Sequence, residues 1–147
     1  MSDATRALAA SLFSEMLAAD QLVRARLSRA LPQGMELSHF VVLDFLAQSK
    51  EERTPADLAR AFHLTRGAMT NTLNKMEWNG YVHIRPDWDD ARRKRVAISP
   101  SGRRARDEAL AAMRPVMEDA VRSIGEDKVR AALPVLREVR VRFGTEG

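Results

Sequence analysis

The sequence has no cysteine and no long apolar run, and each absence excludes a class of protein. Without cysteine the chain cannot form a disulfide framework, a thiolate zinc site or a cysteine redox switch. No stretch approaches the roughly 18 consecutive apolar residues of a membrane-spanning helix. Residues 1–6 also lack the basic segment and apolar core of a secretion signal. The sequence therefore predicts a soluble cytoplasmic protein with no membrane partner.

Residues that carry catalysis or bind metals are equally sparse. The histidines, His39, His63 and His83, are too scattered along the chain to indicate a zinc site. No serine stands out as a nucleophile with a nearby base, and no glycine-rich loop suited to a phosphate is present. We therefore expect no enzymatic activity, no metal and no cofactor.

The residues that are present fit one domain of ordinary size. A chain of 147 residues, 45% of them hydrophobic, can bury a core without a metal or a disulfide. The net charge of +4 and the isoelectric point near 10.1 are compatible with a polyanionic partner. A charge this modest is also common in proteins that bind no nucleic acid, so its position is more informative than its sum.

Helical patterns begin at the N-terminus. Residues 5–31 lack proline and glycine and carry two rows of apolar side chains, which predicts a long helix covered by another element or another subunit. Ser38 is expected to cap a second helix that runs to about Ser49. A hydroxyl cap, a proline and an acid coincide in residues 54–57, so a short helix is predicted to begin there and to reach Phe62.

The central part of the chain predicts a helix-turn-helix. After a tight turn at residues 63–65, Thr65 can cap a helix over residues 66–79. A short helix, a tight turn and a second helix in this order present the second helix to the major groove of DNA. Residues 81–85 and 95–98 then predict two strands of a hairpin.

Two further helices complete the pattern. A serine and a proline at residues 99–100 start one helix, which Gly125 ends, and the last helix covers residues 126–143. Pro115 and Pro134 lie inside these helices, and we expect each to cause a kink.

The second helix of the helix-turn-helix has an apolar inner face, formed by Met69, Leu73 and Met76, and a polar outer face. Asparagine can pair with adenine, arginine with guanine, and threonine or lysine with phosphate, while Gly67 allows close approach of a phosphate to the helix start. A polar outer face is ordinary for an amphipathic helix, but residues 66–75 contain no acid, which favours DNA contact. The predicted DNA-binding residues of this helix are Thr65, Arg66, Gly67, Ala68, Thr70, Asn71, Asn74 and Lys75.

The hairpin tip supplies a second group of charged residues, at positions 87–95. Such loops are most often merely solvated, but the position after a helix-turn-helix favours a wing. We expect Arg92 to enter the minor groove, where negative potential is concentrated. Asp90 can hold the Arg92 guanidinium, and Arg93 and Lys94 can contact phosphates.

Several segments resemble the MarR family of bacterial regulators. The resemblance rests on Leu58-Ala59, residues 64–70, Leu73, residues 76–82, the Asp90-Ala91-Arg92 wing and residues 96–102. Its most specific part is the acid-x-Arg wing followed by a strand and a Ser-Pro-x-Gly helix start, because many winged-helix families share the helix-turn-helix. The likeness spans essentially the whole chain, and Pro134 in the last helix departs from it.

The resemblance implies a mainly α fold with a small β-hairpin wing, a winged helix-turn-helix with dimerisation helices at both ends. The chain is then a single domain over residues 1–147, with a DNA-binding lobe at 36–98 and helical dimerisation regions at 5–31 and 99–147. A homodimer of this kind reads a pseudopalindromic operator whose half-sites lie about 34 Å apart on double-stranded DNA. The apolar rows of the terminal helices agree, since a monomer would leave them exposed. Repression is the family's usual mode, so the resemblance favours a repressor.

The resemblance also implies a small anionic aromatic or lipophilic effector that binds between the dimerisation helices and the DNA-binding lobe and releases DNA. Arg24 and His39 can meet a carboxylate or a phenolate, although core packing is the commoner role for the apolar candidates. The candidate pocket residues are Phe13, Met16, Arg24, His39, Leu43 and Met113. Two other functions stay open, a non-specific architectural DNA-binding protein and a winged-helix protein-interaction module.

Overall fold

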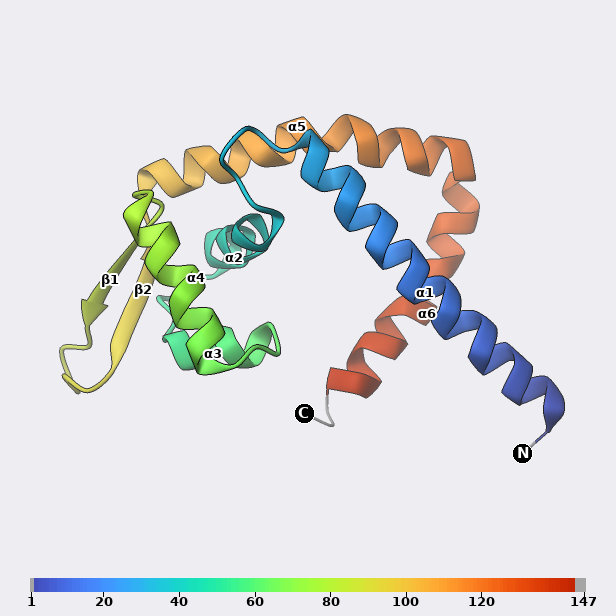
Figure 1. Cartoon of the computed structure of the whole chain (residues 1–147), viewed down its shortest axis with the longest axis horizontal. Coiled ribbons are helices and arrows are strands. Elements are labelled where there is room, and N and C mark those ends of the chain that lie inside the picture. Colours follow the sequence, from blue (N-terminus) through green and yellow to red (C-terminus); the bar gives the residue numbers. More distant parts are fainter. Residues whose placement is uncertain (1, 145–147) are drawn as a thin grey trace.

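The computed structural model describes residues 2–144 and is mainly helical with one two-stranded antiparallel hairpin, which confirms the predicted fold class (Figure 1). In chain order the elements are α1 (Asp3–Ala30), α2 (Leu37–Gln48), α3 (Pro55–Ala61), α4 (Arg66–Trp78), β1 (Val82–Pro86), β2 (Lys94–Ile98), α5 (Pro100–Ile124) and α6 (Glu126–Gly144). We call α2 to β2 the lobe, and α1 and α6 the arms.

Side-chain caps start three of these helices at the predicted residues. Thr54 forms a reciprocal capping box with Asp57 at the start of α3, because each side chain accepts a hydrogen bond from the other's backbone N–H. The hydroxyl of Thr65 accepts from the N–H of Ala68 in α4, and that of Ser99 accepts from the N–H of Gly102 in α5. These local signals therefore predicted the helix starts correctly.

The predicted cap of α2 is wrong. The N-cap is Glu36, whose carbonyl already accepts hydrogen bonds from the N–H groups of His39 and Phe40, so Ser38 lies inside the first turn. The Ser38 hydroxyl donates to the Glu36 carboxylate at 3.4 Å. No side chain caps α2 at its described N-terminus, and the entry of the chain from the preceding turn sets where this helix begins.

The lobe has its own apolar core. Met69, Leu73 and Met76 on the inner face of α4 are almost completely buried, as predicted. They pack with residues of α2, α3, β1 and β2 in one cluster, which contains Val42, Leu43, Leu46, Leu58, Ala59, Met69, Leu73, Met76, Val82 and Val96. This packing fixes the inner side of α4 and therefore leaves its outer side to solvent.

A short bridge adds to the hairpin beside the middle of its second strand. In the β1–β2 ladder Arg85 faces Arg95 and Pro86 faces Lys94. Beside it, the backbone groups of Arg53 and Val96 exchange two hydrogen bonds, of 3.2 and 2.7 Å. The segment that leads into α3 is thereby tied to the strand that carries the wing.

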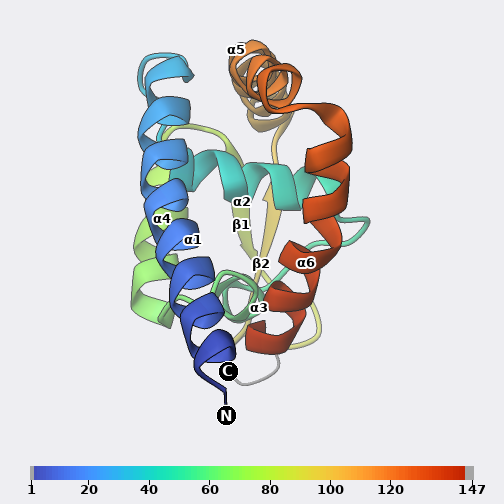
Figure 2. The same ribbon diagram turned by 90° about the vertical axis from the view of Figure 1, so that its right-hand side faces the viewer.

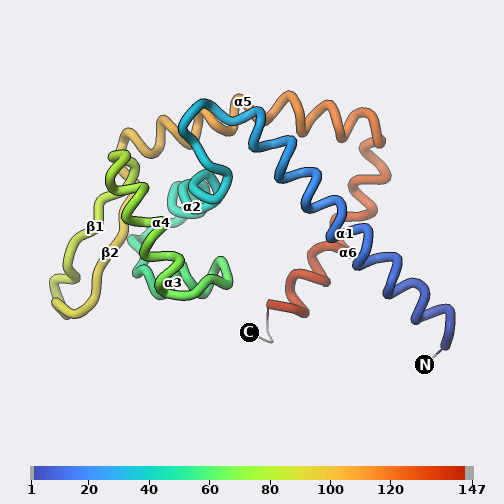
Figure 3. The backbone as a smooth tube through the Cα atoms, in the orientation of Figure 1, coloured from blue at the N-terminus to red at the C-terminus, as the bar shows by residue number. Residues whose placement is uncertain are grey.

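The α6 arm follows the end of α5 that is far from the hairpin, and the α1 arm meets α5 near its middle and points away from the lobe (Figures 1 and 3). Seen from the side, α1 and α6 lie apart beside α5 and draw closer further along (Figure 2), while Figure 1 shows that the two helices cross and that their free ends diverge. The rings of Phe13 in α1 and Phe143 near the end of α6 meet edge to face at 5.6 Å. Pro115 and Pro134 lie inside α5 and α6, which continue beyond them; the predicted kinks stay a prediction. Among the described residues, no helix is both long and apolar enough to cross a membrane.

The joint between the lobe and α5 is tightly packed. The Ser99 hydroxyl donates to the carbonyl oxygen of Gly80 at 2.6 Å, while it also caps α5. A Cβ atom on Gly102 would lie 2.1 Å from the carbonyl oxygen of Tyr81, so only glycine fits there. Because Gly80 and Tyr81 directly follow α4, this joint fixes the orientation of α4 relative to α5.

Candidate nucleic-acid interface

The outer face of α4 is open to solvent over its whole length. The Thr65 cap starts the helix, and the buried inner face directs the other side chains outward. Every residue of the predicted set on this helix is exposed: Thr65, Arg66, Gly67, Ala68, Thr70, Asn71, Asn74 and Lys75. Their contacts with DNA stay a prediction.

A groove separates the outer face of α4 from the hairpin. It has a volume of about 460 Å³ and brings Arg66, Thr70 and Asn74 together with the basic residues 92–95. Gly67, Asn71 and Lys75 are not part of its lining. The full lining is Thr54, Pro55, Ala56, Asp57, Arg60, Arg66, Thr70, Leu73, Asn74, Ile84, Arg92, Arg93, Lys94 and Arg95.

The groove is strongly positive. Its lining includes five arginines and one lysine but a single acid, Asp57. Burial by itself raises the pKa of Asp57, but hydrogen bonds from Thr54 and the charges of Arg60 and Arg53 lower it below its ordinary value. Asp57 is therefore ionised at neutral pH, and it ion-pairs with Arg60. The other cations around the groove create a field that attracts a polyanion.

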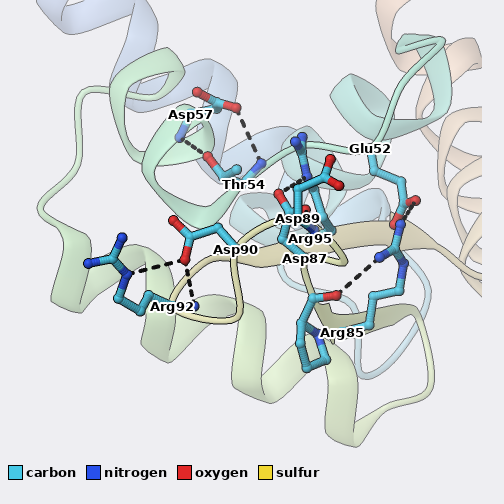
Figure 4. Close-up of polar contacts among 10 residues, drawn as sticks. Glu52, Thr54, Asp57, Arg85, Asp87, Asp89, Asp90, Arg92 and Arg95 are labelled. Carbon is cyan, nitrogen blue, oxygen red and sulfur yellow. Dashed lines mark hydrogen bonds and ion pairs between the residues drawn. The ribbon is translucent and has the colours of Figure 1, made fainter.

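The wing residue Arg92 projects into solvent with its side chain 91% exposed. One carboxylate oxygen of Asp90 accepts hydrogen bonds from the backbone N–H and the Nε–H of Arg92, at 3.1 and 3.2 Å. The expected contact between these residues is therefore present. In Figure 4 the guanidinium points away from the rest of the wing, which leaves its terminal nitrogens open to a partner.

The sequence analysis missed a second set of charged residues, at the base of the wing. Asp87 accepts from the Nε of Arg95 at 3.0 Å, and Glu52 accepts from a terminal nitrogen of Arg85 at 2.5 Å (Figure 4). The first pair lies eight residues apart across the hairpin, so a firm strand register would have predicted it. The second joins residues 33 positions apart, and no local pattern indicates it.

The candidate effector residues do not form one site within a subunit. Leu43 is buried in the lobe core, whereas Met113 is buried in a second cluster, with Leu31, Phe40 and Ala109. Arg24 pairs with Asp20 on its own helix. Met16 is half-buried on α1, and Phe13 is 18 residues before Leu31, about 27 Å along α1 at 1.5 Å per residue. Since Phe13 contacts Phe143, it lies at the arm contact rather than beside the lobe.

His39 has the features of a binding residue most clearly. It is 4% exposed, and its Nδ1 atom is buried without a hydrogen-bond partner. Burial lowers its pKa; nearby Glu36 opposes this effect, and nearby Lys75 adds to it. His39 is therefore neutral at pH 7.

Within residues 2–144, no group of three or more histidines and acids lies close enough together to hold a metal ion.

These elements define a winged helix-turn-helix: α3 and α4 form the helix pair, and the β1–β2 hairpin forms the wing. Residues 33–93 match the sequence model of the MarR family. This part of the chain is therefore similar in sequence to the MarR family. No curated protein sequence matches the chain.

Several solved structures share the fold of most of the chain. BldR from Sulfolobus solfataricus is 24% identical with a TM-score of 0.82, over 97% of this chain and 99% of BldR. RdhR-CbdbA1625, an organohalide-sensing regulator solved with 2,4-dichlorophenol, is 20% identical with a TM-score of 0.82, over 93% and 82% of the two chains. CouR from Rhodococcus jostii RHA1, solved with p-coumaroyl-CoA, is 21% identical with a TM-score of 0.73, over 84% and 87%.

Proposed function

We propose that this protein is a sequence-specific regulator of transcription that binds a pseudopalindromic site on double-stranded DNA as a homodimer, in the cytoplasm. The single observation that carries the proposal is the positive groove between α4 and the wing. Exposed Arg66, Thr70 and Asn74 line one side of this groove, and residues 92–95 line the other. A helix with donors and acceptors suits the major groove, and a projecting guanidinium suits the adjacent minor groove.

The exposed arms support the homodimer. Leu8 and Leu17 on α1 are 71% and 73% exposed, and Ile124 at the end of α5 is 58% exposed. Apolar surface of this extent is costly in water and is normally covered by a partner. A second copy covers it with the same residues, since a twofold interface pairs each patch with itself. Two copies then present two α4 helices to successive major grooves.

An effector-released repressor is the finer form of this proposal. CouR and RdhR-CbdbA1625 were solved with an aromatic acyl-CoA and a chlorinated phenol, so this fold accommodates aromatic and anionic molecules. In this chain the buried Nδ1 atom of His39 is the best-placed acceptor or donor for such a ligand. Screening aromatic acids by thermal shift against wild type and His39→Ala tests this part. A stabilising compound whose effect disappears in the variant is expected.

The main test compares two DNA duplexes at moderate salt. Wild-type protein is titrated against its own promoter region and against a random-sequence duplex of equal length in a gel-shift assay. We expect tighter binding to the promoter region by at least about a thousandfold, the usual lower margin of specific over non-specific sites. Equal affinity for both duplexes would indicate an architectural DNA-binding protein. No binding to either would indicate a protein-interaction module.

A further inference from the structure

Asp87 is the buried acid at the turn of the wing. It is 9% exposed, whereas its neighbour Trp88 is 87% exposed, and Asp89 is also exposed. One carboxylate oxygen of Asp87 accepts from the backbone N–H of Asp89 at 2.9 Å, and the other accepts from the Nε of Arg95 at 3.0 Å (Figure 4). Both carboxylate oxygens therefore hold the wing together. One bonds to Asp89 within the turn, and the other bonds to Arg95 in β2.

The backbone of the turn closes around the same residue. The N–H of Asp87 donates to the carbonyl of Arg93 at 3.0 Å, and the N–H of Arg93 donates to the carbonyl of Asp90 at 2.9 Å. Asp87 thus contacts the residues on both sides of the Asp90–Arg92 tip. Hydrogen bonding from Asp89 and Arg95, with the charge of Arg85, holds the pKa of Asp87 below its usual value.

The wing divides its cations into two groups. Arg85 and Arg95, which face each other across the hairpin, are held at its base by Glu52 and Asp87. Arg92 is held only by the adjacent Asp90, and among the described residues Arg93 and Lys94 have no ion pair. The cations at the tip are therefore the ones available to phosphates, and those at the base maintain the shape of the turn.

We propose that Asp87 is a positioning residue for DNA binding, which fixes the turn over residues 87–93 so that Arg92, Arg93 and Lys94 face the DNA before it arrives. This inference rests on the proposed function, because it assigns a role within the same interface. Asp87 touches no DNA in this arrangement; it acts through Arg95 and through the backbone of the turn. A wing fixed in advance loses less conformational freedom on binding than a mobile one does.

The positioning role and simple electrostatics predict opposite signs. An acid close to phosphates repels them, so removing its charge should strengthen DNA binding if charge alone mattered. If Asp87 positions the wing, the isosteric Asp87→Asn variant should instead weaken binding. Asp89→Asn is the matched control. It removes the same charge two residues further along the chain, and the structure shows no bond of the Asp89 side chain.

The experiment uses the full chain and a duplex that the wild-type protein has selected from a random-sequence pool. Affinity is measured by fluorescence anisotropy of the labelled duplex at several salt concentrations. We expect Asp87→Asn to bind about tenfold more weakly, the factor for one lost charge-assisted hydrogen bond that holds the binding conformation. We expect Asp89→Asn to bind equally or up to about threefold more tightly, as for one screened repulsion removed. Equal or tighter binding by both variants overturns the positioning role.

A second measurement follows the wing without DNA. The chain has two tryptophans, and in a Trp78→Phe background Trp88 alone reports on the wing, where the Arg85 guanidinium lies 5.5 Å from its ring centre. Asp87→Asn should lower the anisotropy of Trp88, and Asp89→Asn should leave it unchanged. An unchanged Trp88 signal in both variants also overturns the proposal.

A third variant covers the case in which Asp87→Asn does not fold. Arg95→Lys keeps the positive charge but lacks the Nε donor, so it should weaken DNA binding like Asp87→Asn, and wild-type affinity in a folded Arg95→Lys would contradict the proposal. If the wild-type protein selects no duplex at all, the proposed function fails, while the Trp88 measurement still tests the fixed wing by itself.

Discussion

The lobe and the arms of this chain both carry many apolar residues but bury them differently. In the lobe Leu43, Leu58 and Met69 are completely buried within one subunit. None of the described residues of α1 or α6 is buried, and Leu8, Leu17 and Leu22 are each at least 70% exposed. The lobe buries most of its large apolar side chains within the subunit, whereas those of the arms stay exposed in it. If a second copy covers the arms, as proposed, stability and assembly depend on different parts of the molecule, and each can be broken separately.

The largest effect is expected from a change in the arms. Asp at both Leu8 and Leu12 of α1 would bury charge in the proposed dimer interface, which costs several kcal/mol per unpaired group. The variant Leu8→Asp/Leu12→Asp should be monomeric by sedimentation and should bind the selected duplex at least about a hundredfold more weakly, because one lobe loses the second half-site. The lobe should keep its cooperative unfolding.

Ser14→Asp is the control, since it adds one negative charge to the opposite side of α1 at an exposed position. It should remain a dimer. A Leu8→Asp/Leu12→Asp protein that remains dimeric would remove α1 from the interface and weaken the contrast between lobe and arms.

The joint between the lobe and α5 should respond next most strongly. Gly102→Ala places a methyl group 2.1 Å from the Tyr81 carbonyl and 2.9 Å from a side-chain atom of Ile98, so the backbone must shift. We expect a loss of about 1–3 kcal/mol in the free energy of unfolding, measured with urea. Gly67→Ala in exposed α4 meets no atom within 4 Å and should be neutral or slightly stabilising. Equal effects of the two substitutions would show that the joint accommodates a methyl group at residue 102 without loss of stability.

Substitution of the wing tip should affect binding but not stability. Arg92 is 91% exposed and bonds only to Asp90, so Arg92→Ala should leave the melting temperature nearly unchanged. DNA affinity should fall about tenfold, as for one lost groove contact. Arg130→Ala is the control, because it removes an exposed arginine from the α6 arm. It should leave both the melting temperature and the DNA affinity nearly unchanged. A large drop in melting temperature for Arg92→Ala would make this arginine structural.

The smallest expected effect is a pH dependence near the start of α2. Burial lowers the pKa of His39 below its ordinary value of 6.5, so the folded protein favours the neutral ring. The stability that this gives is complete above pH 6.5 and is lost as the pH falls from there through the lower folded-state pKa. Between pH 7.5 and 5.5 the free energy of unfolding should therefore fall more for wild type than for His39→Leu. An equal fall in both would show that His39 is protonated without cost.

Signals carried by a few neighbouring residues were read correctly. The caps at Thr54, Thr65 and Ser99 each depend on a hydroxyl and a backbone N–H three residues later, and all three helices begin as expected. Ser38 has the same residue type but lies beside Glu36, where the chain had already entered the helix. At these three helices the local cap signal decided where the helix begins. At α2 the turn at residues 32–36 decided it instead, because the helix already begins at Glu36.

Contacts between distant residues were not predicted. The Glu52–Arg85 pair joins two elements whose approach depends on the lobe core, and the Asp87–Arg95 pair depends on the strand register. The effector candidates show the opposite case, in which a predicted contact is absent within the subunit. The sequence analysis grouped Phe13 with His39, but Phe13 contacts Phe143 on the other arm. A pocket formed by these residues across two copies belongs to the proposed homodimer and is not present in the single subunit.

The order of helices and strands, the acid-free outer face of α4 and the basic wing follow from the sequence itself, because each depends on caps, periodicity or composition within one short segment. Only the tertiary structure decided which wing cations are held by acids, where the groove between α4 and the wing lies, and that the arms remain uncovered. Those outcomes depend on the packing of the lobe core and on the register of the hairpin, which bring together side chains that the sequence separates.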